Sequence, residues 1–217
     1  MVNMPQKCEE YEFNSVEDAL KDFAENKFVI VMDNEDRENE GDLIIAGQSI
    51  TTEQMAFLIR YSSGYICVPM KADRLEELQL PLMVERNSEL MKTAYTVSCD
   101  YIHGTTTGIS AHDRAMTARK LADPTSKPED FSRPGHILPL RAVANGVLDR
   151  FGHTEAGVDL CKLAGVPQVA CIGELLKEDD PEGGMARRDD CFAFGKKHGI
   201  KMITIKDLIA YRQRVGL

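Results

Sequence analysis

Six carboxylates crowd into ten consecutive residues, 33–42, whose sequence is DNEDRENEGD. Apolar runs flank this stretch on both sides, so it must lie at the edge of the core. Where the backbone is extended, side chains alternate, and the acids at every second position from Asp36 to Asp42 then share one face. They repel one another unless Arg37 or a metal cation lies among them. The stretch therefore predicts a site for a hard cation that prefers oxygen ligands.

Two other interpretations of the acidic stretch are a solvated hairpin turn and a calcium-binding loop. Counted from Asp36, the acids Glu38 and Glu40 and the glycine at position 41 imitate the first half of an EF-hand. The twelfth position is Gly47 instead of glutamate, and the flanking segments have the pattern of strands, which excludes the calcium loop. The solvated turn remains the alternative to a cation site.

A glycine turn ahead of a helix gives a second candidate site in residues 150–157, RFGHTEAG. Thr154 is the expected N-cap, and the free N–H groups at the start of a helix attract an anion. Arg150 adds a forked donor that suits phosphate. His153 or Thr154 alone would be an ordinary hydrogen-bonding or capping residue, but in combination with Arg150 they predict a phosphate site.

A hydroxyl-rich loop at residues 105–114, TTTGISAHDR, also runs into the start of a helix. It is equally well interpreted as an anion site or as an ordinary capped turn. Three single residues are candidates of a weaker kind: Cys67 on a strand, His136 in a proline-framed loop and Glu174 at a strand end. Taken one at a time, such residues are usually structural.

Hydrophobic periodicity and capping signals predict the elements that position these residues. Apolar runs predict strands at 28–32, 43–46, 65–68, 93–102, 168–173 and 200–205. Capped amphipathic segments predict helices that begin at the caps Ser15, Thr51 and Ser110 and others at 71–78, 154–164, 190–198 and 206–214. Residues 123–139, with four prolines, predict a shaped loop. We expect an α/β fold of the α+β type, a mixed sheet with helices packed around it in a single domain over residues 1–217.

Composition limits the classes of partner. The net charge of -9 and pI near 5.1 disfavour nucleic acid and anionic lipid, and no apolar run is long enough to span a bilayer. The six cysteines contain no C-x-x-C pair, which favours a reducing compartment and disfavours structural zinc. With no basic, apolar leader at the start, we expect a cytoplasmic protein without a membrane or nucleic acid partner.

Five segments, taken in order, closely resemble the 3,4-dihydroxy-2-butanone 4-phosphate synthase family. They are residues 36–42, 61–69, 107–114, 133–136 and 152–156. The resemblance covers almost the whole chain, with divergence at the N-terminus and at residues 178–188. Nothing that resembles a GTP cyclohydrolase partner follows Leu217, so we expect the monofunctional form.

The resemblance implies a magnesium-dependent carbon-carbon lyase of riboflavin biosynthesis, with manganese as a substitute metal. Its reaction converts D-ribulose 5-phosphate to L-3,4-dihydroxy-2-butanone 4-phosphate and formate. By motif position, Glu38 and His153 are the metal ligands, and His136 and Glu174 are essential for the chemistry. The residues implied in substrate binding are Arg37, Glu38, Asp42, Thr107, Arg150, Gly152, His153, Thr154 and Glu174.

The chemistry needs groups that move protons around a developing oxyanion. Asp42 and Glu174 are the candidates for the base, because crowded carboxylates have raised pKa values. His136 is the candidate acid or proton shuttle. Cys67 is a candidate pocket residue with a reactive thiol.

The resemblance also implies a homodimer with shared active sites, in which the loop from Thr107 or His136 serves the neighbouring subunit. Two other functions fit parts of the pattern. Another metal-dependent phosphosugar isomerase or aldolase would share the cation and the phosphate site. An acidic metal-buffering or partner-binding domain would need only the acidic stretch.

Overall fold

Short runs of β-branched and other apolar residues form one seven-stranded sheet in the computed structural model, which describes residues 12–216. Such side chains suit a pleated surface that is covered on both sides. The strand order is β4-β5-β3-β6-β2-β1-β7. The strands are β1 (Val29–Met32), β2 (Gly41–Ala46), β3 (Cys67–Met70), β4 (Cys99–Tyr101), β5 (Phe131–Arg141), β6 (Ala170–Glu174) and β7 (Lys201–Thr204).

The sheet is mixed, as the sequence predicts. β1 pairs with β7 and β3 with β5 in parallel, whereas the other neighbouring strands are antiparallel. Every residue of β1 and β2 is buried. These two strands enclose the acidic stretch between them, so the ends of that stretch are anchored in the core.

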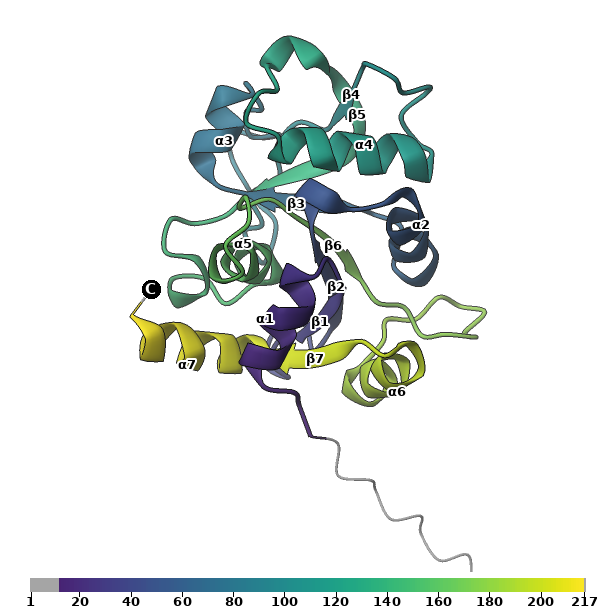
Figure 1. Ribbon diagram of the computed structural model, residues 1–217, viewed down its shortest axis with the longest axis vertical. Coiled ribbons are helices and arrows are strands. Elements are labelled where there is room, and N and C mark those ends of the chain that lie inside the picture. Colours follow the sequence, from purple (N-terminus) through teal and green to yellow (C-terminus); the bar gives the residue numbers. More distant parts are fainter. Residues whose placement is uncertain (1–11, 217) are drawn as a thin grey trace, which may run out of the picture.

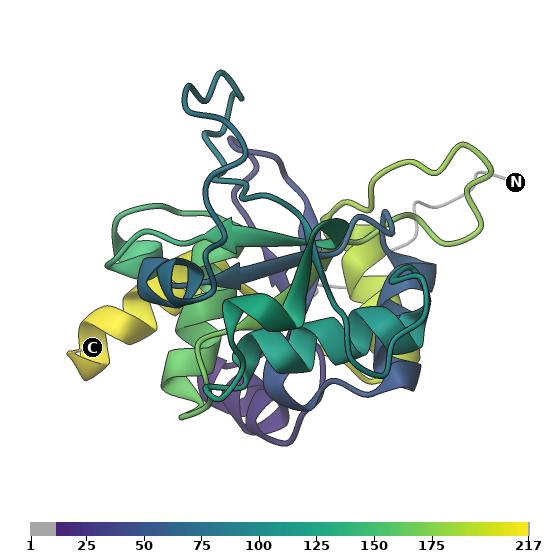
Figure 2. The same cartoon turned by 90° about the horizontal axis from the view of Figure 1, so that it is seen from above.

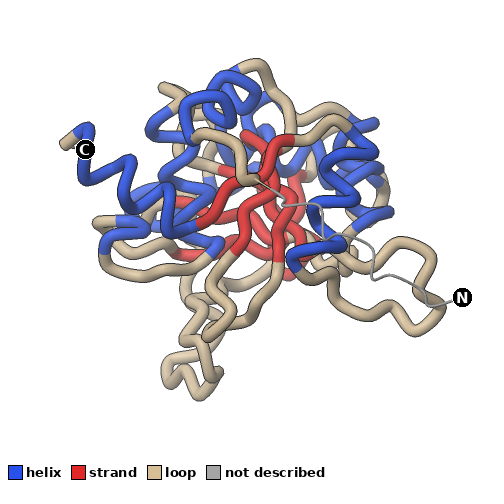
Figure 3. The backbone as a smooth tube through the Cα atoms, turned by 90° about the horizontal axis from the view of Figure 1, so that it is seen from below, coloured by secondary structure: helices blue, strands red, loops and turns tan. Residues whose placement is uncertain are grey.

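Helices cover both faces of the sheet in a single domain (Figure 1). On one face lie α1 (Val16–Ala24), α5 (His153–Leu163) and α7 (Ile205–Val215). On the other lie α2 (Thr52–Tyr61), α3 (Ala72–Glu77), α4 (Ala111–Ala122) and α6 (Arg188–His198). Three short 3₁₀ turns complete the described elements: η1 (Gly47–Ser49), η2 (Pro128–Asp130) and η3 (Gly146–Leu148). Figure 3 shows the strands enclosed between the helices.

The predicted caps start three of these helices. The side chain of Ser15 accepts a hydrogen bond from the backbone of residue 18, and that of Ser110 from the backbone of residue 113. Thr51 and Gln54 bond reciprocally at 3.1 and 3.0 Å, which completes a capping box. These bonds satisfy backbone donors that the first turn of a helix leaves without partners.

The prediction of a loop over residues 123–139 is wrong, because most of its second half is β5 (Phe131–Arg141). Proline in a strand is tolerated where the ladder does not need its N–H group. The pairing of β5 with β4 is irregular at Cys99 and Asp100, and the Asp100 side chain accepts the N–H group of His136 at 2.8 Å. Side-chain bonds of this kind replace ladder bonds, so the prolines do not prevent strand formation.

The strand predicted at residues 93–102 is also shorter than expected. Only β4 (Cys99–Tyr101) forms a ladder, while Tyr95 makes an isolated bridge to Leu140. The segments after α3 (blue-teal) and after β6 (yellow-green) project from the body in Figure 2. Within residues 12–216, no helix combines the length and the apolar character that crossing a membrane requires.

The close approach of β5 to β4 depends on Gly135. A Cβ atom at this position would lie 2.1 Å from the Cys99 carbonyl carbon and 2.3 Å from the Asp100 backbone nitrogen. Because backbone must move to relieve these contacts, Gly135→Ala is expected to lower the free energy of unfolding by about 3 kcal/mol or more. Urea denaturation measures the change.

Gly165→Ala is the matched control. Gly165 has a φ of 72° and nothing within 4 Å of the added atom, so only backbone strain of about 1 kcal/mol is expected. An equal effect of the two substitutions would contradict a specific role for close packing at Gly135.

Candidate active site

A cavity of about 160 Å³ lies at the end of the sheet where β1 and β2 meet the acidic loop. Eight of the residues predicted from the sequence line it: Arg37, Glu38, Asp42, Cys67, Arg150, His153, Thr154 and Glu174. They come from four separate stretches of the chain, at residues 37–42, 67, 150–154 and 174, so the fold brings together what the sequence keeps apart. Tyr65, Glu89, Thr93 and Tyr95 also line the cavity and were not predicted.

Asp33 organises the acidic loop. Its buried carboxylate accepts the N–H groups of Glu38 at 3.1 Å and Glu40 at 2.9 Å, and it pairs with Arg37 at 2.8 Å. Arg37 also pairs with the Glu38 carboxylate. The loop is therefore a folded turn, and the expected extended alternation of acids is wrong: Asp36 is exposed to solvent while Glu38 is half-buried.

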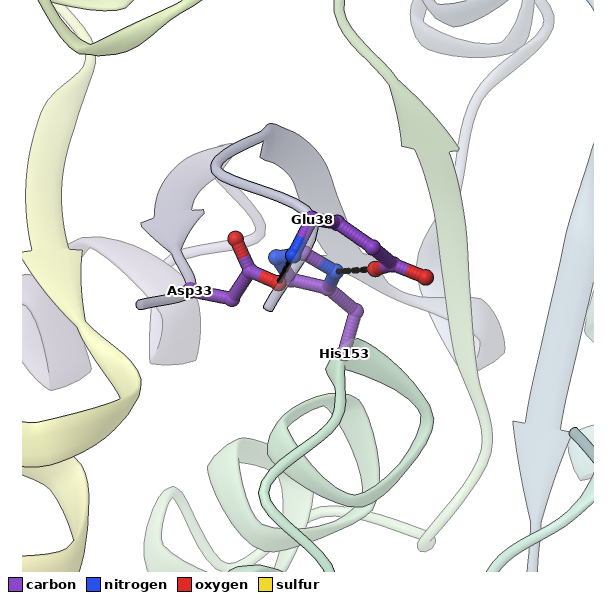
Figure 4. A group of neighbouring side chains, drawn as sticks. All are labelled: Asp33, Glu38 and His153. Atoms are coloured by element: carbon purple, nitrogen blue, oxygen red, sulfur yellow. Dashed lines mark hydrogen bonds and ion pairs between the residues drawn. The ribbon is translucent and has the colours of Figure 1, made fainter. Parts of the chain in front are cut away.

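His153 faces the carboxylates from the start of α5 (Figure 4). Its Nε2–H group donates to the Val31 carbonyl at 3.1 Å, which leaves the Nδ1 lone pair toward the acids. Nδ1 lies 3.8 Å from Glu38 Oε2 and 3.4 Å from Asp42 Oδ1. A backbone carbonyl that fixes one ring nitrogen while the other points at acids is the usual arrangement of a metal-binding histidine.

The carboxylates of this cavity are crowded and desolvated. Asp42 on β2 stands directly opposite Glu174 on β6. Burial, followed by the charges of Glu174 and Glu38, raises the pKa of Asp42 well above its usual value, and burial also raises the pKa of Glu38. Burial lowers the pKa of His153, so this imidazole is neutral and cannot neutralise the acids.

The arrangement fits a hard divalent cation. Ligand atoms of Asp33, Glu38 and His153 lie within 4.8 Å of one another. Asp42 Oδ1 is buried without a hydrogen-bond partner, which costs free energy unless a cation or substrate group satisfies it. Two or more carboxylates with one neutral imidazole are a ligand set that suits magnesium or manganese better than zinc.

The predicted phosphate site differs from expectation at its cap. Thr154 was expected to cap the helix, but α5 begins at His153 and its N-cap is Gly152. A Cβ atom on Gly152 would lie 2.4 Å from Arg150 Nη1, so the close approach of this guanidinium excludes a side chain there. Thr154 is buried in the first turn and lines the cavity.

Arg150 is held in place by three contacts. It pairs with the buried carboxylate of Glu155 at 2.5 Å and donates to the Met91 carbonyl and to Thr93 Oγ1, both at 3.1 Å. The guanidinium thus joins the start of α5 to the projecting segment after α3. Arg150 has a fixed orientation at the cavity wall, next to the first N–H groups of the helix.

Cys67 lies on β3 and lines the cavity, but only 6% of the residue is exposed. Burial, and then the charges of Glu174 and Asp42, raise the pKa of its thiol far above the ordinary value. The structure therefore favours a neutral thiol over the reactive thiolate suggested by the sequence.

His136 and Thr107 form a second group outside this cavity. His136 Nδ1 is 2.6 Å from Asp100 Oδ2, and its side chain is 41% exposed. The loop that carries Thr107 passes beside this pair, since a Cβ atom on Gly108 would lie 2.7 Å from His136 Nδ1. Thr107 itself is exposed to solvent. Neither His136 nor Thr107 lines the cavity that contains Glu38.

Two carboxylates that orient predicted site residues, Asp33 and Asp100, were also missed by sequence analysis. Asp33 was counted among the acids but was not selected, although its position directly after an apolar strand is a signal for a buried carboxylate. Asp100 lies 36 residues from His136 in sequence, and no local pattern joins them.

A carboxylate and histidine pocket at the edge of a mixed sheet is typical of a metal-assisted enzyme. The model of the 3,4-dihydroxy-2-butanone 4-phosphate synthase family matches residues 17–211. A synthase of this name from Schizosaccharomyces pombe is 62% identical over 91% of this chain and 96% of its own. A riboflavin biosynthesis protein of Phocaeicola vulgatus is 50% identical over 94% of this chain and 50% of its own.

A solved structure of a 3,4-dihydroxy-2-butanone 4-phosphate synthase in complex with two magnesium ions has a TM-score of 0.90 and 51% identity, over 93% of this chain and 98% of the other. The chain belongs to the 3,4-dihydroxy-2-butanone 4-phosphate synthase family. It is thus a lyase of riboflavin biosynthesis, and the family and enzyme class expected from the sequence are confirmed.

The raised pKa of Asp42 predicts a pH-dependent cost of folding. The folded protein retains a proton on this carboxyl that the unfolded chain has released, so stability falls as pH rises above about 3.9. Asp42→Asn removes this loss. In the presence of a chelator at pH 7, the variant is expected to gain about 1–3 kcal/mol, with about 2–4 °C in Tm for each kcal/mol.

Thermal unfolding of both proteins between pH 4 and pH 8 measures this difference, which should shrink toward zero at the acidic end. Asp36→Asn is the matched control, because Asp36 is exposed and belongs to the same loop. A gain of the same size in both variants, or a gain that is independent of pH, would contradict a cost caused by the burial of Asp42.

Proposed function

We propose that the chain converts D-ribulose 5-phosphate to L-3,4-dihydroxy-2-butanone 4-phosphate and formate with magnesium, and that manganese substitutes for it. The observation that carries the proposal is the group formed by Asp33, Glu38 and His153 beside the buried Asp42, with Glu174 directly opposite it. A family member of 51% identity binds two magnesium ions, which supports the choice of metal.

Glu38 and His153 are the proposed metal ligands. The Val31 carbonyl holds the imidazole of His153 in the tautomer whose Nδ1 accepts a cation. When bound, the metal would lower the cost of negative charge on adjacent substrate oxygens. Arg37, which pairs with both Asp33 and Glu38, is the proposed contact to substrate beside these ligands.

Asp42 and Glu174 are the proposed groups that take and return protons on carbon and oxygen. Burial raises the pKa of Asp42, and a carboxyl with a raised pKa is the stronger base that proton transfer from carbon requires. Their placement on adjacent strands puts them on one wall of the cavity. Cys67, on β3, lines the same cavity with a buried thiol.

Phosphate binding is proposed at the start of α5, where the first N–H groups of the helix are available to an anion. Gly152 has no side chain, so the Arg150 guanidinium can approach the same place. Thr154 adds a hydroxyl at the cavity wall, and Arg150 adds positive charge. Because this site is remote from the reacting carbons, it orients the sugar and does not take part in bond changes.

A homodimer with shared active sites is proposed to bring His136 and Thr107 to the substrate. Asp100 fixes the His136 ring through Nδ1, so Nε2 is left to donate or accept a proton. This pair lies outside the cavity of its own chain, which supports the proposal that another copy of the chain supplies it. The cytoplasmic location is inferred from five buried cysteines, all free, within residues 12–216.

Formate release distinguishes this function from a phosphosugar isomerase or aldolase. Incubation with ribulose 5-phosphate and magnesium is expected to give formate and the four-carbon phosphate in equal amounts, and a chelator should abolish both. Glu38→Gln should lower turnover at saturating substrate by about 1000-fold, since a lost metal ligand costs several kcal/mol in the transition state. NMR of the products measures both.

Glu35→Gln is the control, because Glu35 lies in the same loop with 76% of its side chain exposed. It should retain near-normal turnover. Consumption of the sugar phosphate without formate would refute the proposed reaction, and full activity of Glu38→Gln would refute the metal assignment.

A shared site predicts complementation between two inactive variants. In an equal mixture of Glu38→Gln and His136→Ala subunits, half of the dimers are mixed and each mixed dimer holds one intact site, so about a quarter of the wild-type activity should return. The mixture is made by joint refolding, followed by the formate assay.

Glu38→Gln mixed with Asp42→Asn is the matched control, because both residues belong to the same cavity and no intact site can form. Absence of recovery with His136→Ala would mean that each chain completes its own site.

A further inference from the structure

The side chain of Arg187, at the start of α6, contacts the backbone of the acidic loop. Its Nη1 donates to the Glu38 carbonyl at 2.6 Å and to the Asn39 carbonyl at 2.9 Å. The same atom lies 3.5 Å from Glu40 Oε1. These bonds join residues almost 150 positions apart in sequence.

The backbone of Arg187 is held in place by helix α6. Arg187 is the N-cap residue of α6, where its N–H group donates to Asp190 at 3.0 Å. Behind it, Cys191 packs against the first residue of β2, since a Cβ atom on Gly41 would lie 2.7 Å from Cys191 Sγ. The guanidinium is therefore placed by a helix that already contacts the strand leading to Asp42.

The loop needs such a support. Its own backbone bonds are local: Asn34 accepts the N–H groups of Arg37 and Asn39. Asn39 has a φ of 54°, in the left-handed region, which asparagine adopts more readily than most residues other than glycine. Arg187 binds the carbonyl of Asn39 and that of the preceding residue, Glu38, so its bonds lie at this turn of the backbone.

We infer that Arg187 is a positioning residue for the metal site: it holds the backbone of Glu38 so that the Glu38 carboxylate faces His153. This inference rests on the proposed function, because it assigns a role toward the metal proposed there. Arg187 does not line the cavity and acts through the loop.

Two possible roles of Arg187, orienting Glu38 or only neutralising the acids, predict opposite changes in metal affinity when the side chain is removed. If Arg187 only neutralised the acids, its removal would leave the site more negative and tighten cation binding. If it orients Glu38, its removal weakens binding despite the added negative charge. Loss of an outer contact of this kind typically costs about 10–100-fold in metal affinity.

The test is metal binding to the full-length chain. Calorimetry measures the binding of magnesium, and electron paramagnetic resonance measures the binding of manganese. Arg187→Ala should raise the dissociation constant about 10–100-fold. Amide hydrogen exchange of residues 34–40 should become faster. With ribulose 5-phosphate, the magnesium concentration for half-maximal rate should rise equally, while kcat at saturating magnesium stays within about threefold of wild type.

Arg188→Ala is the matched control. It removes the same charge at the next position in the sequence, where the side chain of Arg188 pairs with Glu35 and Asp189. It should bind magnesium as tightly as wild type or more tightly. Arg187→Lys, which keeps the charge and a donor, should recover most of the affinity.

The side chain of Arg187 is 48% exposed, so the variants should fold, and their melting temperatures verify it. Equal or tighter binding by Arg187→Ala would overturn the inference and leave the proposed function intact. Failure of the wild-type chain to bind magnesium would overturn the proposed function and this inference together.

Discussion

Asp42 and Glu174 stand opposite each other on neighbouring strands, and both line one small cavity. Two ionised carboxylates at directly opposed positions of a sheet would repel, so burial and the charge of Glu174 together raise the pKa of Asp42. The neutral imidazole of His153 cannot balance them. The fold therefore tolerates a local loss of stability at the place where a cation and a charged substrate would restore it, which is the usual relation between an active site and its scaffold.

The rest of the structure limits this cost to one end of the sheet. β1 and β2 are buried along their whole length, so they fix both ends of the acidic loop. Within the loop, the Asp33 carboxylate replaces backbone acceptors for Glu38 and Glu40. α5 brings His153 against the same loop from the opposite face. The strands and the Asp33 carboxylate thus orient the backbone that carries Glu38 and Glu40.

Local physics explains which parts of the fold were predictable. The apolar run at β1, the Thr51 capping box and the amphipathic stripe of α1 each depend on neighbours within four residues, and each was confirmed. β5 was missed because its irregular ladder uses the Asp100 side chain, which no rule on proline content includes. The cap of α5 was misplaced because Thr154 and Gly152 both suit that role, and only the close approach of Arg150 selects glycine.

The candidate site shows the same division between local and long-range information. Family motifs identify most of the residues in the cavity, yet Asp33 and Arg187 act through backbone groups, which leave little trace in a motif. His136 is separated from the cavity by its position along β5: Leu140 on this strand lines the cavity that contains Glu38, whereas His136, earlier on the same strand, does not. This separation within one chain is the reason why the proposed function assigns His136 to the site of a second copy of the chain. The separation is therefore a property of the fold, and it makes assembly a condition of the proposed chemistry.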